Sequence, residues 1–567
     1  MGNKSMALLA VAASVVIAAS GVTYRNNQIA LQIMNNNNYM NSTNQQQNSM
    51  QGMGSMNMDS MNTPNSNGVA INNHDYAKNI VKPREGQPVK KFTLTAQETN
   101  INVKDGVSMA VWTYNGTVPG QEIRVVQGDF VQVELKNNLK EPVTIHWHGY
   151  PLNSAMDGVP GFNQDAVKPG ETFTYEFSAD VAGTYWYHSH QESSKQVDKG
   201  LYGALIVLPK DQPKPDKDYT LILDEWMENP AQEMGSMSGM DMSGTDSMPS
   251  GESNSNTDMA GMNMPQNEPK DPVMEEEDMM AYAYDIYTVN GKSGALIEPL
   301  QAKKGDVVRL RFINAGYRSH GIHIPGQDIK VVSTDGQNIN GAGLIKDQIL
   351  MIAPGERYDV EFTVASEESF IIDAHDENAY NDQIKIPVNV VDGNGTIREE
   401  ALAEEYPSFD FMNYGMATAT QFSLNQSFDV DYNVELGTDI TNGLKYTING
   451  KVFSELPTLK LKTGDMVKFT YYNNSKVNHP MHLHGHFFQV LSKDGMPLTG
   501  APIIKDTLMV KPGEKFEVVF KADNTGKWVQ HCHELHHATG GMMQGIEYTD
   551  FMPKYTPNPA DTFNKPE

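Results

Sequence analysis

The sequence predicts an all-β protein that consists of three copies of one sandwich-like domain in tandem. Short runs of alternating apolar and polar side chains, such as the run from Phe130 to Leu135, recur from residue 79 onward, and no long helical period appears. Three short patterns, Asn-Gly, Gly-Asp and Pro-Gly-Glu, also recur in this order, at the spacing expected of one β-sandwich domain per set. They begin at Asn115, Gly128 and Pro169 in the first copy, at Asn290, Gly305 and Pro354 in the second, and at Asn449, Gly464 and Pro512 in the third.

Changes in composition set the expected boundaries of the segments. The stretch from residue 26 is rich in Asn, Gln, Ser, Gly and Met, and almost nothing in it could form a core, so we expect it to lack stable structure. A similar stretch interrupts the second copy. We therefore expect a signal peptide or N-terminal anchor at 1–25, a Met- and Asn-rich linker at 26–78, domain 1 at 79–212, domain 2 at 213–400 with a Met-rich insert at 229–280, and domain 3 at 401–567.

The first residues have the pattern of an export signal. The run from Met6 to Val22 is apolar or small throughout, Lys4 precedes it, and Ala18-Ala19-Ser20 offers a small-residue cleavage site. We therefore expect an exported protein that is periplasmic, held at the cell surface or secreted. Because the 17 residues of this run reach the lower limit of a membrane span, an uncleaved anchor that attaches the chain to a membrane is the alternative.

The charge balance argues against one class of partner. The chain has 43 Lys and Arg against 70 Asp and Glu, which gives a net charge of −27. Nucleic-acid binding needs a basic surface, so we expect no nucleic acid among the partners. An acidic surface suits a protein that attracts cations, although solubility alone explains it equally well.

Methionines gather in the two segments that we expect to lack a core. Seven lie between Met34 and Met61 and eleven between Met234 and Met280, so these tracts contain 18 of the 33 methionines in the chain. Thioethers are soft ligands that favour Cu(I), and a flexible polar linker has no packing use for them. We therefore favour copper capture over drift in the composition of a linker.

Cys532 is the only cysteine in the chain, so it forms no intramolecular disulfide. Histidines flank it on both sides. Because side chains alternate between the two faces of a strand, His531 and His533 are expected to face one way and Cys532 the other. A thiolate, two imidazoles and a weakly bound methionine form the ligand set of blue-copper sites. Three of these groups come from Cys532, His537 and Met542, and the natural fourth is His479.

Four pairs of histidines accompany this cysteine. A single His-x-His pair is also compatible with a polar strand face that binds no metal. Four such pairs, one of which encloses the only cysteine, favour metal binding, since histidine is the commonest metal ligand in proteins. The pairs are His146-Trp147-His148, His188-Ser189-His190, His482-Leu483-His484 and His531-Cys532-His533.

The repeat assigns these residues to domains. The position of Cys532 is held by Ser189 in the first copy and by Ala374 in the second, so only domain 3 can build the thiolate site. Domains 1 and 3 each keep four histidines that this site does not use. The two sets are most simply satisfied by facing each other, which predicts a polynuclear metal cluster at the interface of domains 1 and 3. In domain 2 we interpret His320, His323 and His375 as structural residues, with an accessory metal site as the alternative.

The motifs resemble the four copper-binding motifs of the multicopper oxidases, and the resemblance covers roughly residues 85 to 550. Within the family they look most like those of bacterial three-domain laccase-like enzymes and copper-resistance copper oxidases. The resemblance implies three cupredoxin-like Greek-key β-sandwich domains in tandem, in agreement with the repeat. It is carried by His146-Trp147-His148-Gly149, by His188-Ser189-His190, by His479-Pro480-Met481-His482-Leu483-His484-Gly485, and by His531-Cys532-His533 with His537 and Met542.

The resemblance also implies a role for each motif residue and four copper ions: one type 1, one type 2 and two type 3. Cys532 and its neighbours His531 and His533 would carry electrons from the type 1 copper to the other three ions. Asp157 matches a family carboxylate that helps to deliver protons, although Asp157-Gly158 is also a common turn. The implied ligands are His479, Cys532, His537 and axial Met542 for type 1, with Met543 the less suitable axial residue; His146 and His482 for type 2; and His148, His188, His190, His484, His531 and His533 for type 3.

The implied activity is that of an oxidoreductase. A reducing substrate would give single electrons to the type 1 copper, and O2 would be reduced to water at the trinuclear copper cluster. Cu(I) and phenolic compounds are the expected electron donors, and copper tolerance is the expected task. The alternatives are a general laccase that oxidises phenols and a non-catalytic copper-binding or storage protein.

The sequence departs from the family pattern in two places. Ala538 follows His537 where many relatives have a carboxylate, so a proton relay through that position is missing, and the sequence does not fix the direction of Glu534. The residues before His479 are Lys476-Val477-Asn478, where the best-described cuprous oxidases have Met and Asp, so their substrate site does not transfer. The methionine tract from Met234 to Met280 is the expected substitute.

Overall fold

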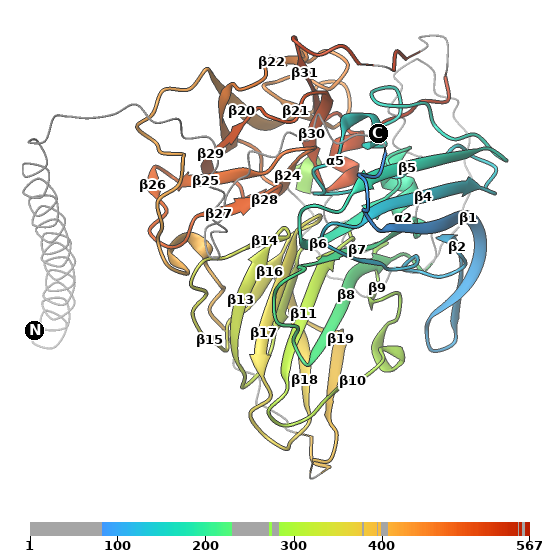
Figure 1. Ribbon diagram of the computed structural model, residues 1–567, viewed down its shortest axis with the longest axis vertical. Helices are drawn as coiled ribbons and strands as arrows, with labels where there is room; N and C mark the ends of the chain where they lie inside the picture. Colours follow the sequence, from blue (N-terminus) through green and yellow to red (C-terminus); the bar gives the residue numbers. More distant parts are fainter. Residues whose placement is uncertain are drawn as a thin grey trace, which may run out of the picture. The chain divides into compact units, whose positions relative to one another are not determined.

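The first repeat folds into two β-sheets, drawn in blue to green in Figure 1. Its elements are β1 (Val89–Lys104), β2 (Val107–Tyr114), β3 (Ile123–Val126), β4 (Phe130–Asn137), η2 (Ser154–Met156), β5 (Thr172–Ser178), β6 (Gly183–His188), α2 (Ser193–Asp198) and β7 (Tyr202–Leu208). One sheet has the strand order β2-β1-β4-β5 and the other β3-β7-β6. The alternation in β4 buries Val131, Val133 and Leu135 completely, and Trp147 packs against Tyr175 within the same core.

The second repeat builds two larger sheets. Its elements are β8 (Lys217–Trp226), β9 (Ile286–Val289), η3 (Gly294–Leu296), β10 (Leu300–Ala302), β11 (Val307–Asn314), β12 (His320–His323), β13 (Asp328–Thr334), β14 (Gln337–Asn338), β15 (Ile345–Lys346), β16 (Leu350–Ile352), β17 (Arg357–Thr363), β18 (Phe370–Asp376), β19 (Ala379–Val390) and η4 (Phe411–Asn413). The strand orders are β14-β13-β17-β11-β8-β9, with β15 paired to β13, and β10-β19-β18-β12-β16.

The third repeat copies this plan. Its elements are β20 (Val430–Asp439), β21 (Lys445–Ile448), β22 (Leu459–Leu461), β23 (Met466–Asn473), β24 (His479–Leu483), β25 (Phe488–Lys493), β26 (Met496–Pro497), β27 (Ile503–Lys505), β28 (Thr507–Val510), β29 (Lys515–Lys521), β30 (Lys527–Cys532), α5 (Leu535–Thr539) and β31 (Met543–Tyr548). The strand orders are β21-β20-β23-β29-β25-β26, with β27 paired to β25, and β22-β31-β30-β24-β28. One continuous apolar core joins the second and third repeats.

The same pairs of strands recur in every repeat. The first strand runs parallel to the strand that follows the Gly-Asp turn, as β1 with β4, β8 with β11 and β20 with β23. A second parallel pair closes the other sheet, as β3 with β7, β10 with β19 and β22 with β31. The strands are joined by long crossing connections, as in Greek-key sandwiches, so the predicted all-β fold is confirmed.

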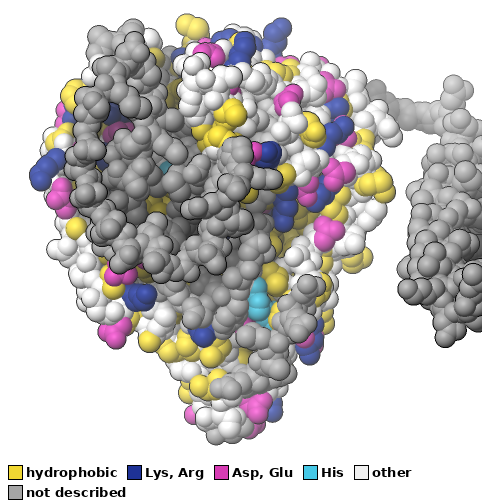
Figure 2. Space-filling view, turned by 180° about the vertical axis from the view of Figure 1, so that it is seen from behind, with side chains coloured by type: hydrophobic (Ala, Val, Ile, Leu, Met, Phe, Trp, Pro, Cys, Tyr) yellow, Lys and Arg dark blue, Asp and Glu magenta, His cyan; other side chains and the backbone are white. Residues whose placement is uncertain are grey.

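This computed structural model describes residues 82–228, 271–274, 280, 283–376, 379–393, 395–397, 406–553, 555–557 and 562–567, which all belong to one compact unit, Asn67–Glu567. The expected signal or anchor at 1–25, the linker at 26–78 and most of the insert at 229–280 lie outside these residues. Within them, no helix has the length and apolar character that crossing a membrane requires. On the face shown in Figure 2, side chains of both charge signs are interspersed among the described residues.

Candidate metal centre

Two adjacent strands, β24 and β30, position the cysteine and the histidines beside it. They pair antiparallel, with Met481 opposite Cys532 and His482 opposite His531. Residues directly opposite each other share a face of the sheet, so Cys532 lies on one face and His531 on the other. His533 follows the strand, and its ring centroid lies 5.7 Å from that of His531. One segment of chain therefore serves two separate groups of side chains, as the alternation predicts.

His479, Cys532 and His537 form the first group, which we call the thiolate group. The Sγ atom of Cys532 lies 3.7 Å from Nδ1 of His479 and 3.7 Å from Nδ1 of His537, and the two Nδ1 atoms are 3.2 Å apart. All three side chains are buried. This donor set at this spacing can hold a metal ion, and a thiolate with two imidazoles suits copper.

Backbone hydrogen bonds link Met542, and not Met543, to two residues of the thiolate group. The amide of Cys532 donates to the carbonyl of Met542 at 3.0 Å, and the amide of Met542 donates to the carbonyl of His537 at 3.0 Å. Met542 lies in the same apolar core as Cys532. Met543 instead pairs with His531 across the strands and packs in a separate cluster with Val529.

Eight buried histidines form the second group, which we call the histidine cluster. It joins the first and third repeats, because one His-x-His pair of the first repeat stacks on one pair of the third. The ring of His146 lies 3.9 Å from that of His484, and the ring of His148 lies 3.8 Å from that of His482. The remaining four close the group at ring distances of 5.2 to 5.4 Å: His188, His190, His531 and His533.

Hydrogen bonds fix the protonated nitrogen of five cluster histidines, and in four of these the other nitrogen has no partner among the described residues. A carbonyl oxygen can only accept, so each Nδ1 that contacts a carbonyl carries the proton, and Nε2 keeps its lone pair for a metal. The Nδ1 donors and their acceptors are His146 to Asp157 at 2.9 Å, His188 to Ser189 at 2.9 Å, His190 to Pro566 at 2.8 Å, His482 to Asp506 at 3.0 Å and His531 to Cys532 at 2.9 Å. In the described part of the chain, Nε2 has no hydrogen-bond partner in His146, His188, His190 and His482.

His148 has the opposite orientation. Its Nε2 lies 3.1 Å from Oγ1 of Thr507 and 3.3 Å from Oδ1 of Asp506, and its Nδ1 is the buried nitrogen without a partner among the described residues. Both nitrogens of His533 likewise lack hydrogen bonds there. Buried polar atoms are normally satisfied, so unpartnered nitrogens on several histidines in one place fit a group of metal ions.

Burial keeps these imidazoles neutral, which metal binding requires. It lowers the pKa of His148, His188, His484, His531 and His533 well below the usual value, and neighbouring histidines add to the effect. Burial, followed by the nearby His146, lowers the pKa of His190 to about 3.

These pKa shifts predict that the copper-free protein loses stability in mild acid. Unfolded histidines bind protons below about pH 6.5, whereas the folded cluster does not until far lower pH, so the unfolded state gains protons first. The stability is complete above pH 6.5, and each such histidine lowers the free energy of unfolding by about 1.4 kcal/mol per pH unit below it. Urea unfolding of copper-free protein at pH 7 and pH 5 measures this effect. Equal stability at the two values would contradict it.

Asp157 contacts the cluster from both repeats. Its Oδ2 lies 3.0 Å from Nδ1 of His484, and its Oδ1 lies 3.2 Å from Nδ1 of His146. The residue also ends the short helix η2, and the following Gly158 has a φ of 84° with the carbonyl of Ile145 where a Cβ would lie. The turn and the contact with the cluster therefore coexist, because the turn aims the carboxylate at the histidines.

The second and third repeats together form a buried ion pair that the sequence analysis missed. Arg357 donates from two nitrogens to Asp506 at 2.7 and 2.6 Å, and Asp506 in turn lies 3.4 Å from Nδ1 of His482. Burial alone would raise the pKa of Asp506, but Arg357 holds it well below its usual range. The turn before Arg357 packs on the cluster too, since a Cβ at Gly355 would lie 2.7 Å from the ring of His533. The only signal in the sequence was a charged pair, Lys505-Asp506, inside an apolar run.

Residues 562–567 form a second contact that the sequence analysis missed. This segment lies against the first repeat, where Lys565 and Glu192 pair at 2.9 Å and the carbonyl of Pro566 accepts from His190. The side chain of Glu567 is buried, accepts a hydrogen bond from the hydroxyl of Ser193, and lies 3.6 Å from Nδ1 of His190. Burial raises the pKa of Glu567 to about 8. The polar, proline-containing sequence of the segment gives no sign of this position.

Polar and charged side chains contact the outer nitrogens of the two histidines of the thiolate group. Ser475 Oγ lies 2.8 Å from Nε2 of His479, and Glu534 Oε2 lies 3.1 Å from Nε2 of His537. Glu534 also contacts Nδ1 of His536 at 2.7 Å. Burial would raise the pKa of Glu534, but His537 and His536 keep it below its usual value. Burial would lower the pKa of His536, but Glu534 and then Asp198 hold it well above.

The histidines of the second repeat lie apart from both groups and contact carboxylates. His320 Nε2 lies 3.0 Å from Oε1 of Glu225, and His323 Nδ1 lies 3.0 Å from Oδ1 of Asp373. His375 Nε2 lies 3.3 Å from the same oxygen of Asp373. Contacts of this kind are common for structural histidines, and the structural interpretation stays a prediction.

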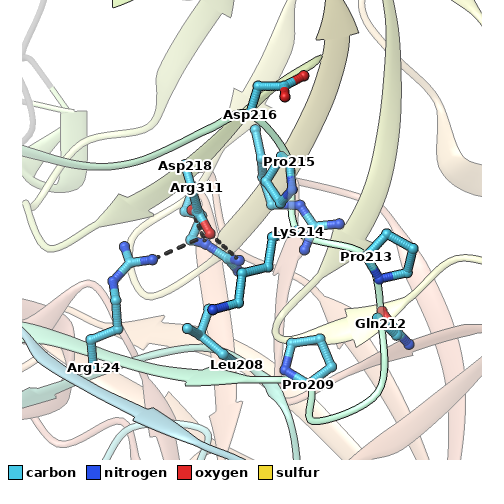
Figure 3. A pocket seen from close by; sticks show the side chains of 11 residues that line it. Arg124, Leu208, Pro209, Gln212, Pro213, Lys214, Pro215, Asp216, Asp218 and Arg311 are labelled. Carbon is cyan, nitrogen blue, oxygen red and sulfur yellow. Dashed lines mark hydrogen bonds and ion pairs between the residues drawn. The ribbon is translucent and has the colours of Figure 1, made fainter. Parts of the chain in front are cut away.

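A cavity of about 250 Å3 lies away from these groups, between the end of β7 and the start of β8. Figure 3 shows that Arg124 and Arg311 meet at Asp218 on its wall. Arg309, also on the wall, pairs with Glu361 at 2.6 Å. Each of these guanidinium groups already has a carboxylate partner, and we assign the cavity no function.

Comparison with known proteins agrees with the fold and the two groups of side chains. Models of the family described as multicopper oxidase match residues 95–212, 217–394 and 419–550. Multicopper oxidase MmcO from Mycobacterium tuberculosis is 31% identical over 83% of this chain and 89% of its own. The copper resistance protein A homolog of Pseudomonas syringae pv. tomato is 26% identical over 82% of this chain and 94% of its own. The solved multi-copper oxidase from Pseudomonas Thermotolerans superposes with a TM-score of 0.60 at 26% identity, covering 82% of this chain and 100% of that one. The chain therefore belongs to the multicopper oxidase family of laccase-like oxidoreductases.

Proposed function

We propose that this oxidase couples the one-electron oxidation of a reducing substrate at a type 1 copper to the four-electron reduction of O2 to water at a trinuclear copper cluster. One observation carries the proposal. His531-Cys532-His533 supplies the thiolate of one group and two imidazoles of the other, so a few covalent bonds connect the two groups. A storage protein has no need for such a connection.

The ligand assignment rests on the nitrogens and the sulfur that face each other. His479, Cys532 and His537 would hold the type 1 copper, because the Sγ atom and the two Nδ1 atoms lie within 3.7 Å of one another. Met542, whose backbone is hydrogen-bonded to Cys532 and His537, would be the axial ligand. The unpartnered nitrogens of the histidine cluster support the remaining assignment. His146 and His482 would hold the type 2 copper, and the two type 3 coppers would be held by His148, His188 and His533 and by His190, His484 and His531.

Copper at these positions supplies electron transfer and the reduction of O2, and the chain supplies ligation, orientation and protons. The carbonyl groups that accept from Nδ1 keep the imidazole rings in the orientation that directs Nε2 inward. Asp157, in contact with both His146 and His484, is the group that we propose to hold a proton beside the cluster.

Cu(I) is the donor that we favour, because the end of the Met-rich insert docks beside the thiolate group. Asp271 pairs with Lys476, which lies three residues before His479, and Val273 is buried in the core that also contains Cys532. Just beyond the same end of the insert, Tyr284 contacts Nε2 of His536 at 3.3 Å. Thioethers anchored at this point would present Cu(I) close to the type 1 site.

We expect the thioethers of the insert to be needed for Cu(I) oxidation and not for phenol oxidation. The test compares the copper-loaded full chain with a variant of equal length in which the methionines between Met234 and Met264 are serines. O2 uptake driven by Cu(I) should fall, and uptake driven by a phenolic donor should persist, because the docked residues 271–274 are unchanged. Equal rates with Cu(I) would remove the proposed role of the insert and favour a general laccase.

The name of one relative, copper resistance protein A homolog, supports copper tolerance as the physiological task. We further propose that the chain is exported, with residues 1–25 as the signal or anchor, because the N-terminal sequence has the pattern of an export signal. Capture of Cu(I) outside the cytoplasm is consistent with this location. A copper-storage protein, the alternative from a different class, would bind copper fully and consume no O2.

A further inference from the structure

We propose that Glu534 lowers the reduction potential of the type 1 site through its contact with the outer nitrogen of His537, and that His536 moderates this effect. The inference rests on the proposed type 1 site. It concerns residues that bind no metal themselves, and three features of the structure support it: the direction of the carboxylate, the way in which it is held, and the asymmetry between the two histidines of the thiolate group.

The carboxylate of Glu534 contacts the edge of His537 that faces away from Cys532 and His479. Nδ1 of His537 faces Cys532 and His479, so Nε2 points away from them and carries the proton when Nδ1 is a ligand. Oε2 of Glu534 lies 3.1 Å from this Nε2. Both side chains are almost completely buried, at 7% and 3% exposure, so water competes little for the contact.

The local fold holds the carboxylate in this position. Glu534 caps the N-terminus of α5, where it accepts from the backbone amides of His536 at 3.2 Å and His537 at 2.7 Å. The same capped turn places His537. The distance from the carboxylate to the imidazole is therefore fixed by the backbone rather than by a free side chain.

The two imidazoles of the thiolate group have unequal partners. The outer nitrogen of His479 faces the neutral hydroxyl of Ser475 at 2.8 Å, whereas that of His537 faces a carboxylate. A carboxylate that accepts from a ligand imidazole makes the imidazole more basic and stabilises the more highly charged metal ion. For copper this favours Cu(II) over Cu(I) and lowers the reduction potential. A lower potential disfavours phenols that are hard to oxidise and leaves easily oxidised donors.

His536 offsets part of this charge. Its Nδ1 lies 2.7 Å from Oε1 of Glu534, and its Nε2 lies 3.6 Å from Asp198 of the first repeat. Tyr284 and Tyr317 pack beside it. Removing the imidazole would leave more of the negative charge of Glu534 to act on His537, so the two residues should move the potential in opposite directions.

The experiment is a redox titration of the blue thiolate–copper absorption in the copper-loaded full chain. Glu534→Gln keeps a capping oxygen but removes the charge, so its potential should shift upward. His536→Gln should shift the potential downward. Asp410→Asn is the matched control, because Asp410 caps another helical turn, η4, by accepting from the amide of Met412 at 2.9 Å, and this variant should have the wild-type potential.

Opposite shifts in the two variants would support the proposal. Unchanged potentials with intact blue absorption, or shifts in the same direction, would overturn it. If Glu534→Gln fails to bind type 1 copper, His536→Gln decides: a lower potential supports the proposal, and an unchanged or higher one overturns it. A wild-type chain that binds copper without blue absorption would overturn the type 1 site itself, and this result differs visibly from a failure of the tuning alone.

Discussion

Replacing Cys532 with serine is expected to reduce O2 uptake to the background rate and to remove the blue absorption. Cys532 is completely buried, and its Sγ lies 3.7 Å from both imidazoles of the thiolate group. A serine hydroxyl is a hard, weakly acidic group that does not replace a thiolate as a copper ligand. The histidine cluster does not depend on Sγ, so it should keep its copper. Visible absorption, copper content and O2 uptake measure the three effects.

Ser189→Ala is the matched control for this variant. Ser189 occupies the position of Cys532 in the first repeat, between His188 and His190, and donates to Gln196 at 2.7 Å. Its removal disturbs a comparable segment next to the cluster but takes away no donor atom of the thiolate group. The control should keep the blue absorption. A Cys532→Ser variant that still absorbs like the wild type and consumes O2 would contradict the assignment of the thiolate.

Replacing Arg357 with methionine is expected to have the largest effect on stability. Arg357 and Asp506 are completely buried and joined by two short hydrogen bonds. Removal of one partner leaves an unpaired buried charge, which costs about 3 to 5 kcal/mol of unfolding free energy. Because Asp506 also contacts His148 and His482, copper occupancy of the histidine cluster should fall as well. Denaturant unfolding of the copper-free chain measures the first effect, and copper analysis the second.

Arg309→Met provides the comparison. Arg309 pairs with Glu361 at 2.6 Å on a neighbouring position of the same sheet, but the two side chains are 18% and 25% exposed. Such a pair contributes about 0 to 1 kcal/mol. If the two variants lost equal stability, burial of the Arg357–Asp506 pair would not be the reason for its importance, and its position behind the cluster would need another explanation.

The fold was predictable because one domain occurs three times. The Gly-Asp and Pro-Gly-Glu turns precede strands at equivalent places, and the parallel pairs β1 with β4, β8 with β11 and β20 with β23 follow from the same pattern in each repeat. The alternation around Cys532 was equally readable, since a strand separates neighbouring side chains onto opposite faces. Local rules of this kind need no knowledge of distant contacts.

The surroundings of the site were not predictable, because they come from contacts between remote segments. Arg357 and Asp506 are separated by 149 positions, and each alone resembles an ordinary charged residue. Glu567 reaches Ser193 from the far end of the sequence. The direction of Glu534 depends on the turn that it caps, which periodicity does not specify. A pattern of ligands is local in sequence, whereas the side chains that orient the ligands are not.

The most direct test of the central claim is the stoichiometry of O2 uptake by the copper-loaded chain with a limiting amount of electron donor. The account predicts one O2 for every four electrons, no accumulation of hydrogen peroxide, and no uptake by the copper-free chain. Full copper occupancy without uptake from either Cu(I) or a phenolic donor would contradict the account and leave a copper-binding protein.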